Sequence, residues 1–345
     1  MQTNRVLVGL SLGVDSLATA LLLKAESFYV VGVCLRIHEQ TPDLEKVKSI
    51  CEENEIEFHY VDLRQEFQTT VVKRFADYYL KGFTPNICTH CNAEFKIETL
   101  LKYADIYSCH YVATGHYAQI ENAQIKIAKD SWKDQSYMLY RLKENQRKRL
   151  LLPLGDKMKD EVKDFVRERG YHEIANKRES FGLCFTDGQH YSEYLLNQYP
   201  QLKNLENGKV IDKNNQVVGT HRGFPFYTIG QYKGMQIKEK LYINKIIAEE
   251  NTLVVGEKSE CYFSTIELNS LVFSQNLESI KLNAAYLTKI RGKDEGSLAF
   301  LKEISPNHAL IQFSKPVFAP MQGQDVVVYD ENSSILFGGR IIDFK

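Results

Sequence analysis

The sequence predicts an α/β protein in which a doubly wound parallel sheet is followed along the chain by two small all-β domains. Three observations predict this order. Short apolar runs alternate with helical periods in the first third of the chain, and a stretch with a surplus of basic residues follows. The last part consists of short alternating strands separated by Asn-Gly, Asn-Asn and Gly-Gly turns. We place the domain boundaries at residues 1–204, 205–262 and 263–345.

The first predicted unit is a strand, a tight turn and a helix. Residues 5–10 form an apolar run, and Val14, Leu17, Ala18 and Leu21 then recur at helical spacing. Further strands are predicted over Tyr29–Leu35, Glu57–Val61 and Tyr111–Thr114, with helices over Leu44–Asn54, Phe67–Leu80 and Asn92–Tyr107. Strands that alternate with helices in this way build a parallel sheet with helices on both faces.

A basic segment follows the predicted sheet. The region from Gln135 to Gly170 is predicted to be mostly helical, with an amphipathic helix over Lys159–Arg169. The overlapping segment Arg141–Arg178 carries 12 Lys and Arg against 7 Asp and Glu. A solvated helix face explains such a surplus from charge alone. The alternative is a surface for nucleic-acid phosphates, which would cover about residues 135–180.

Composition limits the class of protein. The chain has 345 residues, 43% hydrophobic and 25% charged, which is typical of a folded multidomain protein. A net charge of −1 excludes a globally basic nucleic-acid coat, although not a local basic face.

The cellular location follows from the N-terminal stretch and the cysteines. The apolar stretch Val6–Leu23 is interrupted by Ser11, Asp15, Ser16 and Thr19 and has no basic segment before it, so we expect neither a signal peptide nor a membrane span. Seven cysteines, an odd number in a chain without an export signal, indicate reduced thiols and a cytoplasmic protein.

The turn after the first strand is a candidate anion site. Its residues are Gly9, Leu10, Ser11, Leu12, Gly13, Val14, Asp15 and Ser16. Backbone N–H groups at a helix N-terminus, with a Ser hydroxyl near each end, favour an anion such as pyrophosphate. No Gly-Lys-Ser/Thr follows, so the turn is not a Walker A loop. Asp15 is either a ligand for Mg²⁺ or a plain helix N-cap.

Two cysteine motifs are candidate nucleophile sites. Cys88 and Cys91 form a Cys-x-x-Cys, and Cys91 is predicted at a helix N-terminus, where the positive end of the dipole favours the reactive thiolate. Half of a zinc site is the alternative, but no second pair completes it. Cys184 lies in the apolar run Ser180–Phe185, and by itself it is interpreted as a buried structural cysteine.

Taken together, these motifs resemble the tRNA-specific 2-thiouridylase family over almost the whole chain. The anion turn is similar to the PP-loop Ser-Gly-Gly-x-Asp-Ser of ATP pyrophosphatases, with Leu12 in place of the first Gly. If that position needs a positive φ, Leu is unfavourable there by about 1 kcal/mol or more. The other matches are Thr84–Asn92 (with Ile87 for a family Pro), Ala113–Ala118, Lys133–Tyr137, Ser180–Phe185, Phe226–Gln231, Gly323-Gln324 and Val328-Tyr329.

The resemblance implies a reaction. Members of this family use ATP to adenylate the C2 oxygen of the wobble uridine in tRNA and then replace that oxygen with sulfur. The sulfur arrives as a persulfide from a cysteine desulfurase, directly or through a sulfur-carrier protein. The implied partners are therefore the tRNA anticodon loop and a sulfur donor, with no membrane, and the implied fold is that of a PP-loop ATP pyrophosphatase.

The resemblance also assigns roles to residues. Cys184 would carry the persulfide and Cys91 would attack it, with a disulfide between the two as one outcome. ATP would be bound by Gly9, Leu10, Ser11, Leu12, Gly13, Val14, Asp15, Ser16, Leu35 and Gly115, with Mg²⁺ at Asp15. The target base and the tRNA would contact Asn86, Ile87, Cys88, His116, Lys133, Asp134, Gln135, Arg291, Gly292 and Gln324. An iron–sulfur cluster at Cys88, Cys91 and Cys184 is an alternative use of the three thiols.

Departures from the family pattern leave two other functions open. Leu12 alters the PP-loop, Tyr232 stands where the family has Arg, and the stretch Arg291-Gly292-Lys293 replaces an Arg-Tyr-Arg type sequence. A catalytically impaired paralogue that still binds tRNA would explain such changes. A different PP-loop ligase is the other alternative, although it would have no use for the spaced cysteines.

Overall fold

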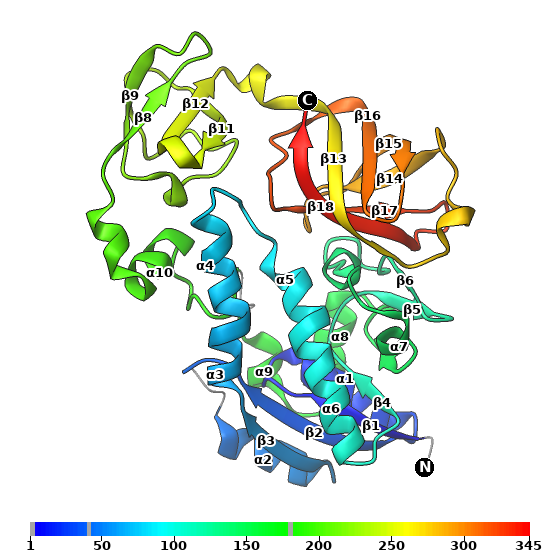
Figure 1. Ribbon diagram of the computed structural model, residues 1–345. Helices are drawn as coiled ribbons and strands as arrows, with labels where there is room; N and C mark the ends of the chain where they lie inside the picture. The colour runs from blue at the N-terminus through cyan, green and yellow to red at the C-terminus, as the bar shows by residue number, and fades with distance from the viewer. Residues whose placement is uncertain (1–3, 40–42, 179–181) are drawn as a thin grey trace. The chain divides into compact units, whose positions relative to one another are not determined.

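The structure is a computed structural model that describes residues 4–39, 43–178 and 182–345 (Figure 1). The chain forms two compact units. Unit 1 comprises Met1–Val72, Cys88–Ser180 and Asp330–Ile335, and unit 2 comprises Lys73–Ile87, Phe181–Tyr329 and Leu336–Lys345. Both units are assembled from segments that are far apart in the sequence.

Unit 1 contains the parallel sheet predicted from the sequence. Its strands are β1 (Arg5–Gly9), β2 (Tyr29–Arg36), β3 (Glu57–Asp62), β4 (Tyr111–Ala113) and β7 (Leu150–Leu151). Their order is β3-β2-β1-β4-β7, and every neighbouring pair is parallel. The strand order reverses between β1 and β4, and ligands of open α/β sheets bind at this switch point, outside the carboxyl ends of the strands.

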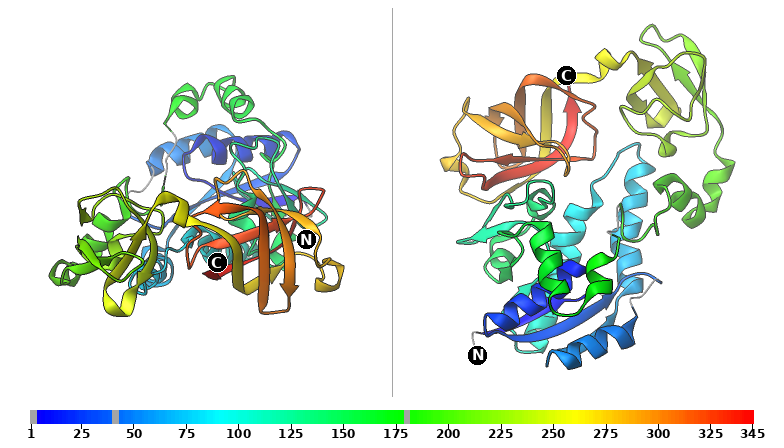
Figure 2. Two further views of the ribbon diagram at one scale, coloured as in Figure 1. Left: turned by 90° about the horizontal axis from the view of Figure 1, so that it is seen from above. Right: turned by 180° about the vertical axis from the view of Figure 1, so that it is seen from behind.

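Helices cover both faces of the sheet, as a doubly wound fold requires. The helices α1 (Val14–Ala25) and α2 (Leu44–Glu53) bury their apolar sides in the same cluster as alternate residues of β1, such as Val6 and Val8. The helix α6 (Ile97–Ile106) packs on β1 and β4, and its Leu100 reaches the Cα of Gly9 from the opposite face. Figure 2 shows α8 (Lys159–Arg167) beside α1, and α9 (His172–Asn176) packs on α8 and shares a buried cluster with α1.

Two of the predicted helices contain a π turn. The first consists of α3 (Arg64–Phe67), the π segment η1 (Gln68–Val72) and α4 (Lys73–Tyr79). The second consists of α5 (Ile87–His90), the π segment η2 (Cys91–Lys96) and α6. The two π segments contact each other. The second helix was predicted to begin at Asn92, which is wrong, because no residue between Ile87 and Cys91 breaks a helix.

The basic segment is less helical than predicted. It contains η3 (Ser136–Leu139), α7 (Glu144–Arg147), strand β7, α8 (Lys159–Arg167) and α9 (His172–Asn176). A hairpin of β5 (Gln119–Glu121) and β6 (Gln124–Lys126) precedes it. Several of its cations are buried: the Arg147 guanidinium donates to the carbonyls of Ala123 and Leu142, at 2.7 and 2.6 Å. The solvated basic face expected here is therefore smaller than the charge count indicates.

Unit 2 contains the two predicted all-β domains. They follow α10 (Tyr191–Gln198) and the 3₁₀ turn η4 (Pro200–Asn204). The first is a five-stranded sheet of order β10-β9-β8-β12-β11, formed by Gln236–Ile237, Val217–His221, Gly208–Ile211, Thr252–Gly256 and Tyr242–Ile247. The second is a closed barrel of order β13-β16-β15-β14-β17-β18, formed by Tyr262–Phe273, His308–Phe318, Ser297–Ile304, Ala285–Lys289, Asp325–Tyr329 and Ile335–Phe344. Short 3₁₀ turns lie at η5 (Phe224–Phe226), η6 (Ala248–Glu250), η7 (Lys258–Cys261) and η8 (Leu277–Ser279).

Candidate functional site

The predicted anion turn lies at the switch point of the sheet in unit 1. β1 ends at Gly9, the Leu10 amide donates to the carbonyl of Val33 at 2.8 Å, and α1 begins at Val14. The Ser16 hydroxyl accepts from the Ser11 amide at 3.2 Å and donates to the Gly13 carbonyl at 3.0 Å. These bonds close the turn upon itself, so its shape is fixed before any anion arrives.

Leu12 adopts a left-handed backbone conformation. Its φ is 55°. The condition under which Leu is unfavourable at this position, a positive φ, is therefore met. A Leu side chain is unfavourable there by about 1 kcal/mol or more, whereas a Gly is not. The side chain is half-buried against the clusters that contain α1, and this packing offsets part of the strain.

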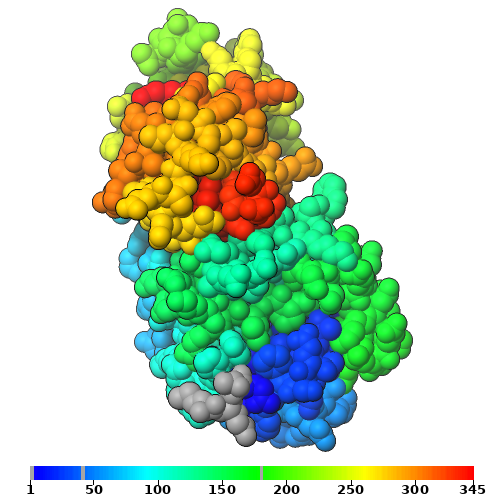
Figure 3. Space-filling model, turned by 90° about the vertical axis from the view of Figure 1, so that its right-hand side faces the viewer, coloured from blue at the N-terminus to red at the C-terminus, as the bar shows by residue number. Residues whose placement is uncertain are grey.

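The carboxylate of Asp15 is held by two side chains from other elements. The Lys159 ammonium lies 2.6 and 2.8 Å from its two oxygens, and the Tyr117 hydroxyl donates to Oδ1 at 2.9 Å. The same ammonium lies 5.4 Å from the centre of the Tyr117 ring. Because α1 and α8 pack together, their residues adjoin on the surface in Figure 3, and the first residue of α8 reaches the turn. The negative charge predicted to hold Mg²⁺ is thus balanced by a cation of the protein.

Lys159 is a functional candidate that the sequence analysis missed. It is 6% exposed although it is the first residue of a helix, where a cation opposes the helix dipole. Its position three residues before Val162 and seven before Val166 places it on the buried side of α8. A charged residue on an apolar stripe needs a partner, and this pattern was the available signal.

The strand β4 brings a second loop to the same switch point. Gly115 lies against the backbone of Asp15: a Cβ at this glycine would meet the Asp15 carbonyl carbon at 2.8 Å. His116 is buried, its Nδ1 lies 2.8 Å from the Thr114 hydroxyl, and burial, followed by the charge of Lys96, lowers its pKa well below the ordinary value. The imidazole is therefore neutral at pH 7, and Lys96 is a further residue near the site that was not predicted.

Asp134 and Gln135 form part of the internal framework in unit 1. The Asp134 carboxylate accepts from the Ala128 amide at 3.0 Å, from the Ser136 amide at 3.1 Å and from the Ser136 hydroxyl at 2.9 Å. The Gln135 side chain accepts from the Tyr117 amide at 2.9 Å. These two residues fold the loop around Lys133, while Lys133 itself is half-buried.

Cys91 is the first residue of the π segment η2. It is half-buried and lies one turn inside the helix, so it is Cys88 that lies in the first turn, and the predicted placement of Cys91 at the helix N-terminus is wrong. Asn92 is buried next to it, and its side chain donates to the Met138 carbonyl at 3.2 Å. π turns inserted into α-helices are frequently found at functional sites.

Asn86 and Ile87 follow an anchored segment of unit 2. The Thr84 amide donates to the Gln322 carbonyl at 2.9 Å, and its hydroxyl lies 2.8 Å from that of Thr228. The Thr228 hydroxyl in turn donates to the sulfur of Met321 at 2.9 Å. The segment that precedes the Cys-x-x-Cys is thus bonded to both all-β domains.

Cys184 is exposed, and its interpretation as a buried structural cysteine is wrong. It lies in a turn between Gly182 and Gly188, which have φ values of 95° and 73°. The following residue, Phe185, is buried, and its ring lies 5.3 Å from that of Phe75 and 5.2 Å from that of Tyr194. The chain therefore anchors the residue next to the thiol and leaves the thiol accessible. Ser180 and Phe181 of this motif lie outside the described residues.

The three predicted residues of the C-terminal barrel lie in unit 2. The Arg291 guanidinium donates to the carbonyls of Phe318 and Ala319. The Gln324 carbonyl accepts from the Ile341 amide at 2.8 Å, and Gly292 is half-buried. Arg291 thus supports the backbone at the end of β16.

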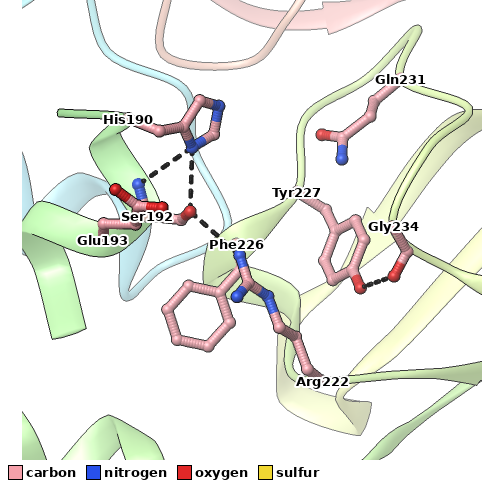
Figure 4. Close-up of a pocket in the computed structure, with 8 residues that line it drawn as sticks. All are labelled: His190, Ser192, Glu193, Arg222, Phe226, Tyr227, Gln231 and Gly234. Atoms are coloured by element: carbon pink, nitrogen blue, oxygen red, sulfur yellow. Dashed lines mark hydrogen bonds between the residues drawn. The ribbon is translucent and has the colours of Figure 1, made fainter. Parts of the chain in front are cut away.

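A pocket of about 380 Å³ lies between α10 and the first all-β domain (Figure 4). Arg222 crosses it: its guanidinium donates to the Ser192 hydroxyl at 2.9 Å and lies 4.7 Å from the centre of the Phe226 ring. The other lining residues are His190, Glu193, Tyr227, Gln231 and Gly234. No predicted site residue lines this pocket.

The predicted residues are thus distributed over both units. Unit 1 brings together the turn from Gly9 to Ser16, Leu35 at the carboxyl end of β2, and Gly115. Cys91 and Cys184 are each described within their own unit, so their approach stays a prediction. In residues 4–39, 43–178 and 182–345, no group of three or more His, Cys, Asp or Glu could hold a metal ion. Within the same ranges no helix is long and apolar enough to span a bilayer.

Comparisons with known proteins identify the family. Residues 4–188 match the family model described as "tRNA methyl transferase HUP domain", and residues 194–257 match "tRNA methyl transferase PRC-barrel domain". The chain is 36% identical to "tRNA-specific 2-thiouridylase MnmA 1" of Clostridium tetani, covering 99% of this chain and 97% of the relative. This protein belongs to the tRNA-specific 2-thiouridylase family.

Further relatives of this family are similarly close. The chain is 35% identical to "tRNA-specific 2-thiouridylase MnmA" of Natranaerobius thermophilus, covering 99% of this chain and 98% of the relative. It is 34% identical to "tRNA-specific 2-thiouridylase MnmA 3" of Bacteroides fragilis, covering 98% and 94%. Solved structures are more distant: "Crystal structure of a 4-thiouridine synthetase - RNA complex with bound ATP" has 21% identity and a TM-score of 0.39, covering 57% of this chain and 51% of the other.

Proposed function

We propose that this protein is an ATP-dependent tRNA 2-thiouridylase, a sulfurtransferase that replaces the C2 oxygen of the wobble uridine with sulfur. The observation that carries the proposal is a closed anion turn at the switch point of the parallel sheet, in a chain that also presents the two family cysteines. Membership of the family implies that ATP is consumed.

The turn from Gly9 to Ser16 supports binding of the ATP phosphates. Its backbone N–H groups lie where β1 ends and α1 begins, so the helix dipole favours the negative charge. Leu35 and Gly115 lie on the strands to either side and would border the nucleotide.

Asp15 would hold Mg²⁺ and Lys159 would bind the phosphates. Mg²⁺ takes one or two carboxylates together with substrate phosphates and keeps several waters, so a single Asp suffices. It would supply charge neutralisation on the phosphates. Lys159, whose ammonium contacts Asp15 in this structure, would contact a phosphate oxygen instead when nucleotide is bound. The charges of Asp15 and Lys159 would thus each have a partner of opposite sign, both with and without nucleotide.

Sulfur transfer would follow adenylation. AMP on the C2 oxygen makes that oxygen a leaving group, and a Cys184 persulfide supplies the sulfur. The Cys91 thiolate attacks the inner sulfur of the persulfide, forms a Cys91–Cys184 disulfide and releases hydrosulfide. Hydrosulfide then adds to C2, and AMP leaves with the oxygen. An external thiol reductant regenerates both cysteines.

The substrate base would have to leave its stack to react. Bases in an anticodon loop are unpaired and can be splayed out into a protein pocket. Asn86, Ile87 and Cys88 directly precede Cys91 and would border that base. The sulfur donor would be a cysteine desulfurase or a sulfur-carrier protein, and the exposed position of Cys184 supports this delivery. The iron–sulfur use of the three cysteines stays a prediction.

Two alternatives have observations in their favour. The description of the family model names methyl transfer, but that reaction has no use for two cysteines or for a pyrophosphate-binding turn. An impaired paralogue is favoured by the strained Leu12. The closed turn and the retained Asp15, Cys91 and Cys184 favour the active enzyme.

The proposal is tested by two products of one reaction. Purified protein is incubated with ATP, an unmodified tRNA transcript and a desulfurase with cysteine, and pyrophosphate and 2-thiouridine are measured. We expect both products from the wild type, and a loss of both by about 100-fold in Lys159→Met and Asp15→Asn, because each removes charge at the phosphates. Lys163→Met, on the same helix, is the control and should keep both activities. Pyrophosphate release unchanged in Lys159→Met would refute the ATP site, and a wild type that binds the tRNA but forms no product would favour the impaired paralogue.

A further inference from the structure

Trp132 is the one tryptophan of the chain and has no packing role that explains it. It is 89% exposed, far more than any other large hydrophobic residue among those the structure describes. An indole in water gains none of the burial energy that usually retains this residue. Tryptophan is enriched at surfaces that bind another molecule, because its apolar ring and its N–H can both make contacts there.

The turn that carries Trp132 is fixed at both ends. On its N-terminal side, the Lys129 amide donates to the Gly155 carbonyl at 2.9 Å. Asp130 is buried, its carboxylate accepts from the Lys159 amide at 2.9 Å, and its carbonyl accepts from the Lys133 amide at 3.1 Å. On its C-terminal side, Asp134 is buried and fully engaged with backbone and hydroxyl donors. The indole is therefore presented by a preorganised loop, which lowers the entropic cost of binding.

The charges of this turn are sorted by sign. Both carboxylates, Asp130 and Asp134, point into the protein and accept hydrogen bonds there. Two lysines flank the indole in the sequence: Lys129 is exposed and lies 3.4 Å from Glu161, and Lys133 is half-buried. An aromatic surface flanked by ammonium groups fits a nucleobase attached to a phosphate backbone, because every base has a π face and every nucleotide a negative charge.

We propose that Trp132 is a stacking platform for an unpaired nucleobase of the tRNA substrate, with Lys133 beside it for the adjoining phosphate. This inference rests on the proposed function and adds a base-binding site outside the reacting uridine. It also connects substrate binding to the ATP site. The Asp130 carboxylate that fixes the turn accepts from the backbone of Lys159, the residue whose side chain pairs with Asp15.

The test uses the native fluorescence of this single tryptophan. The full-length protein is titrated with the unmodified tRNA transcript, and we expect the indole emission to be quenched to saturation. The affinity for tRNA of Trp132→Ala, Trp132→Phe and Lys133→Ala is measured by filter binding over a range of salt concentrations. Leu298→Ala, which removes another exposed apolar side chain, from strand β15, is the matched control.

Stacking and charge predict different results. Trp132→Ala should weaken binding about tenfold at every salt concentration, because a base stack is lost and no phosphate contact is. Trp132→Phe should retain binding within about threefold, since it keeps a ring. Lys133→Ala should reduce the salt slope by about one. Leu298→Ala should bind as the wild type does.

Two results would overturn the inference. Either an unchanged affinity in Trp132→Ala, or quenching by the cysteine desulfurase and not by tRNA, would assign the indole to no RNA contact. Thiolation by the wild type distinguishes these results from failure of the proposed function. A wild type that neither binds tRNA nor thiolates it would refute the function itself, and with it this inference.

Discussion

The two cysteines that the proposed reaction needs are built into opposite kinds of environment. Cys91 is half-buried in a long helix, and the neighbouring Asn92 is tied to the Met138 carbonyl. Cys184 is exposed in a turn between two glycines with positive φ, next to the buried ring of Phe185. The contrast fits the two proposed roles: Cys91 is a nucleophile held in place by a helix, and Cys184 is a thiol that an external sulfur donor can reach. Three predictions test this comparison, and a fourth tests the anion turn.

Loss of either thiol should have the largest effect. Cys91→Ser and Cys184→Ser should each lower 2-thiouridine formation by roughly 1,000-fold or more, because a serine hydroxyl neither carries a persulfide nor attacks one. Pyrophosphate release that depends on tRNA should continue, since the ATP site lies elsewhere in the chain. Mass spectrometry of the nucleosides and a pyrophosphate assay measure the two steps. Cys109→Ala, at a buried cysteine with no proposed role, is the control, and thiolation by Cys184→Ser at the wild-type rate would contradict the relay.

Removal of the buried Phe185 ring should loosen the turn that carries Cys184. Phe185→Ala deletes a buried ring in contact with Phe75 and Tyr194, and we expect unfolding to become easier by about 3 kcal/mol. Thiolation at a temperature where the variant is folded should fall about tenfold, because the thiol is no longer positioned. Denaturant unfolding and the thiolation assay measure the two effects. Phe185→Leu should recover most of both, and equal activity in all three proteins would show that the anchor has no role.

Alkylation should rank the thiols by their environment. At pH 8, iodoacetamide should modify Cys184 at least about tenfold faster than Cys51, because burial, together with the charges of Cys34 and Glu52, raises the pKa of Cys51 to about 11. Because the pKa of Cys51 is raised, almost none of this thiol is in the reactive thiolate form at pH 8. Burial also raises the pKa of Cys34, which should react slowly as well. Peptide mapping gives the order, and rapid modification of Cys51 would contradict it.

The change at Leu12 should have the smallest effect. Leu12→Gly removes the strain of a positive φ but also loses the packing of the side chain, so stability should change by no more than about 1 kcal/mol. The pyrophosphate rate should stay the same or rise by up to about fivefold, since backbone and phosphate can then approach closely. Leu22→Gly, in the middle of α1, is a contrasting control that should destabilise the protein. A large loss of activity in Leu12→Gly would show that the Leu side chain itself serves the site.

Periodicity and turn chemistry were enough to predict most of the fold. The strands at residues 5–10, 29–35, 57–61 and 111–114 were predicted within a residue at each end, because each is a buried apolar run between turns. Strand β7 was missed because two residues, Leu150 and Leu151, show no period. The start of the second π-containing helix was misplaced because Cys88-Thr89-His90 has no strong helix signal, although these residues form α5 together with Ile87.

The site was predictable where chemistry is local and not where it is tertiary. The anion turn follows from adjacent residues, and the resemblance to a loop with Gly at position 12 raised the question of the positive φ found there. The pairing of Asp15 with Lys159 joins residues 144 positions apart, and no pattern in the sequence states the partner of a buried lysine. Burial of Cys184 was wrongly predicted from its apolar neighbour Phe185, because adjacent side chains in a turn can have opposite exposure; its role as persulfide carrier, implied by the resemblance, stays a prediction.

The discontinuous build of unit 1 has a consequence for how the protein is made. Its hairpin of β5 and β6 is completed by the turn at 330–335, where the Ile127 amide donates to the Ser333 carbonyl at 3.0 Å and Lys126 bridges to Ser334. Translation must therefore have passed residue 335 before unit 1 can be completed. Nascent chains that stall before residue 330 would expose an unsatisfied hairpin edge, and such edges recruit other chains.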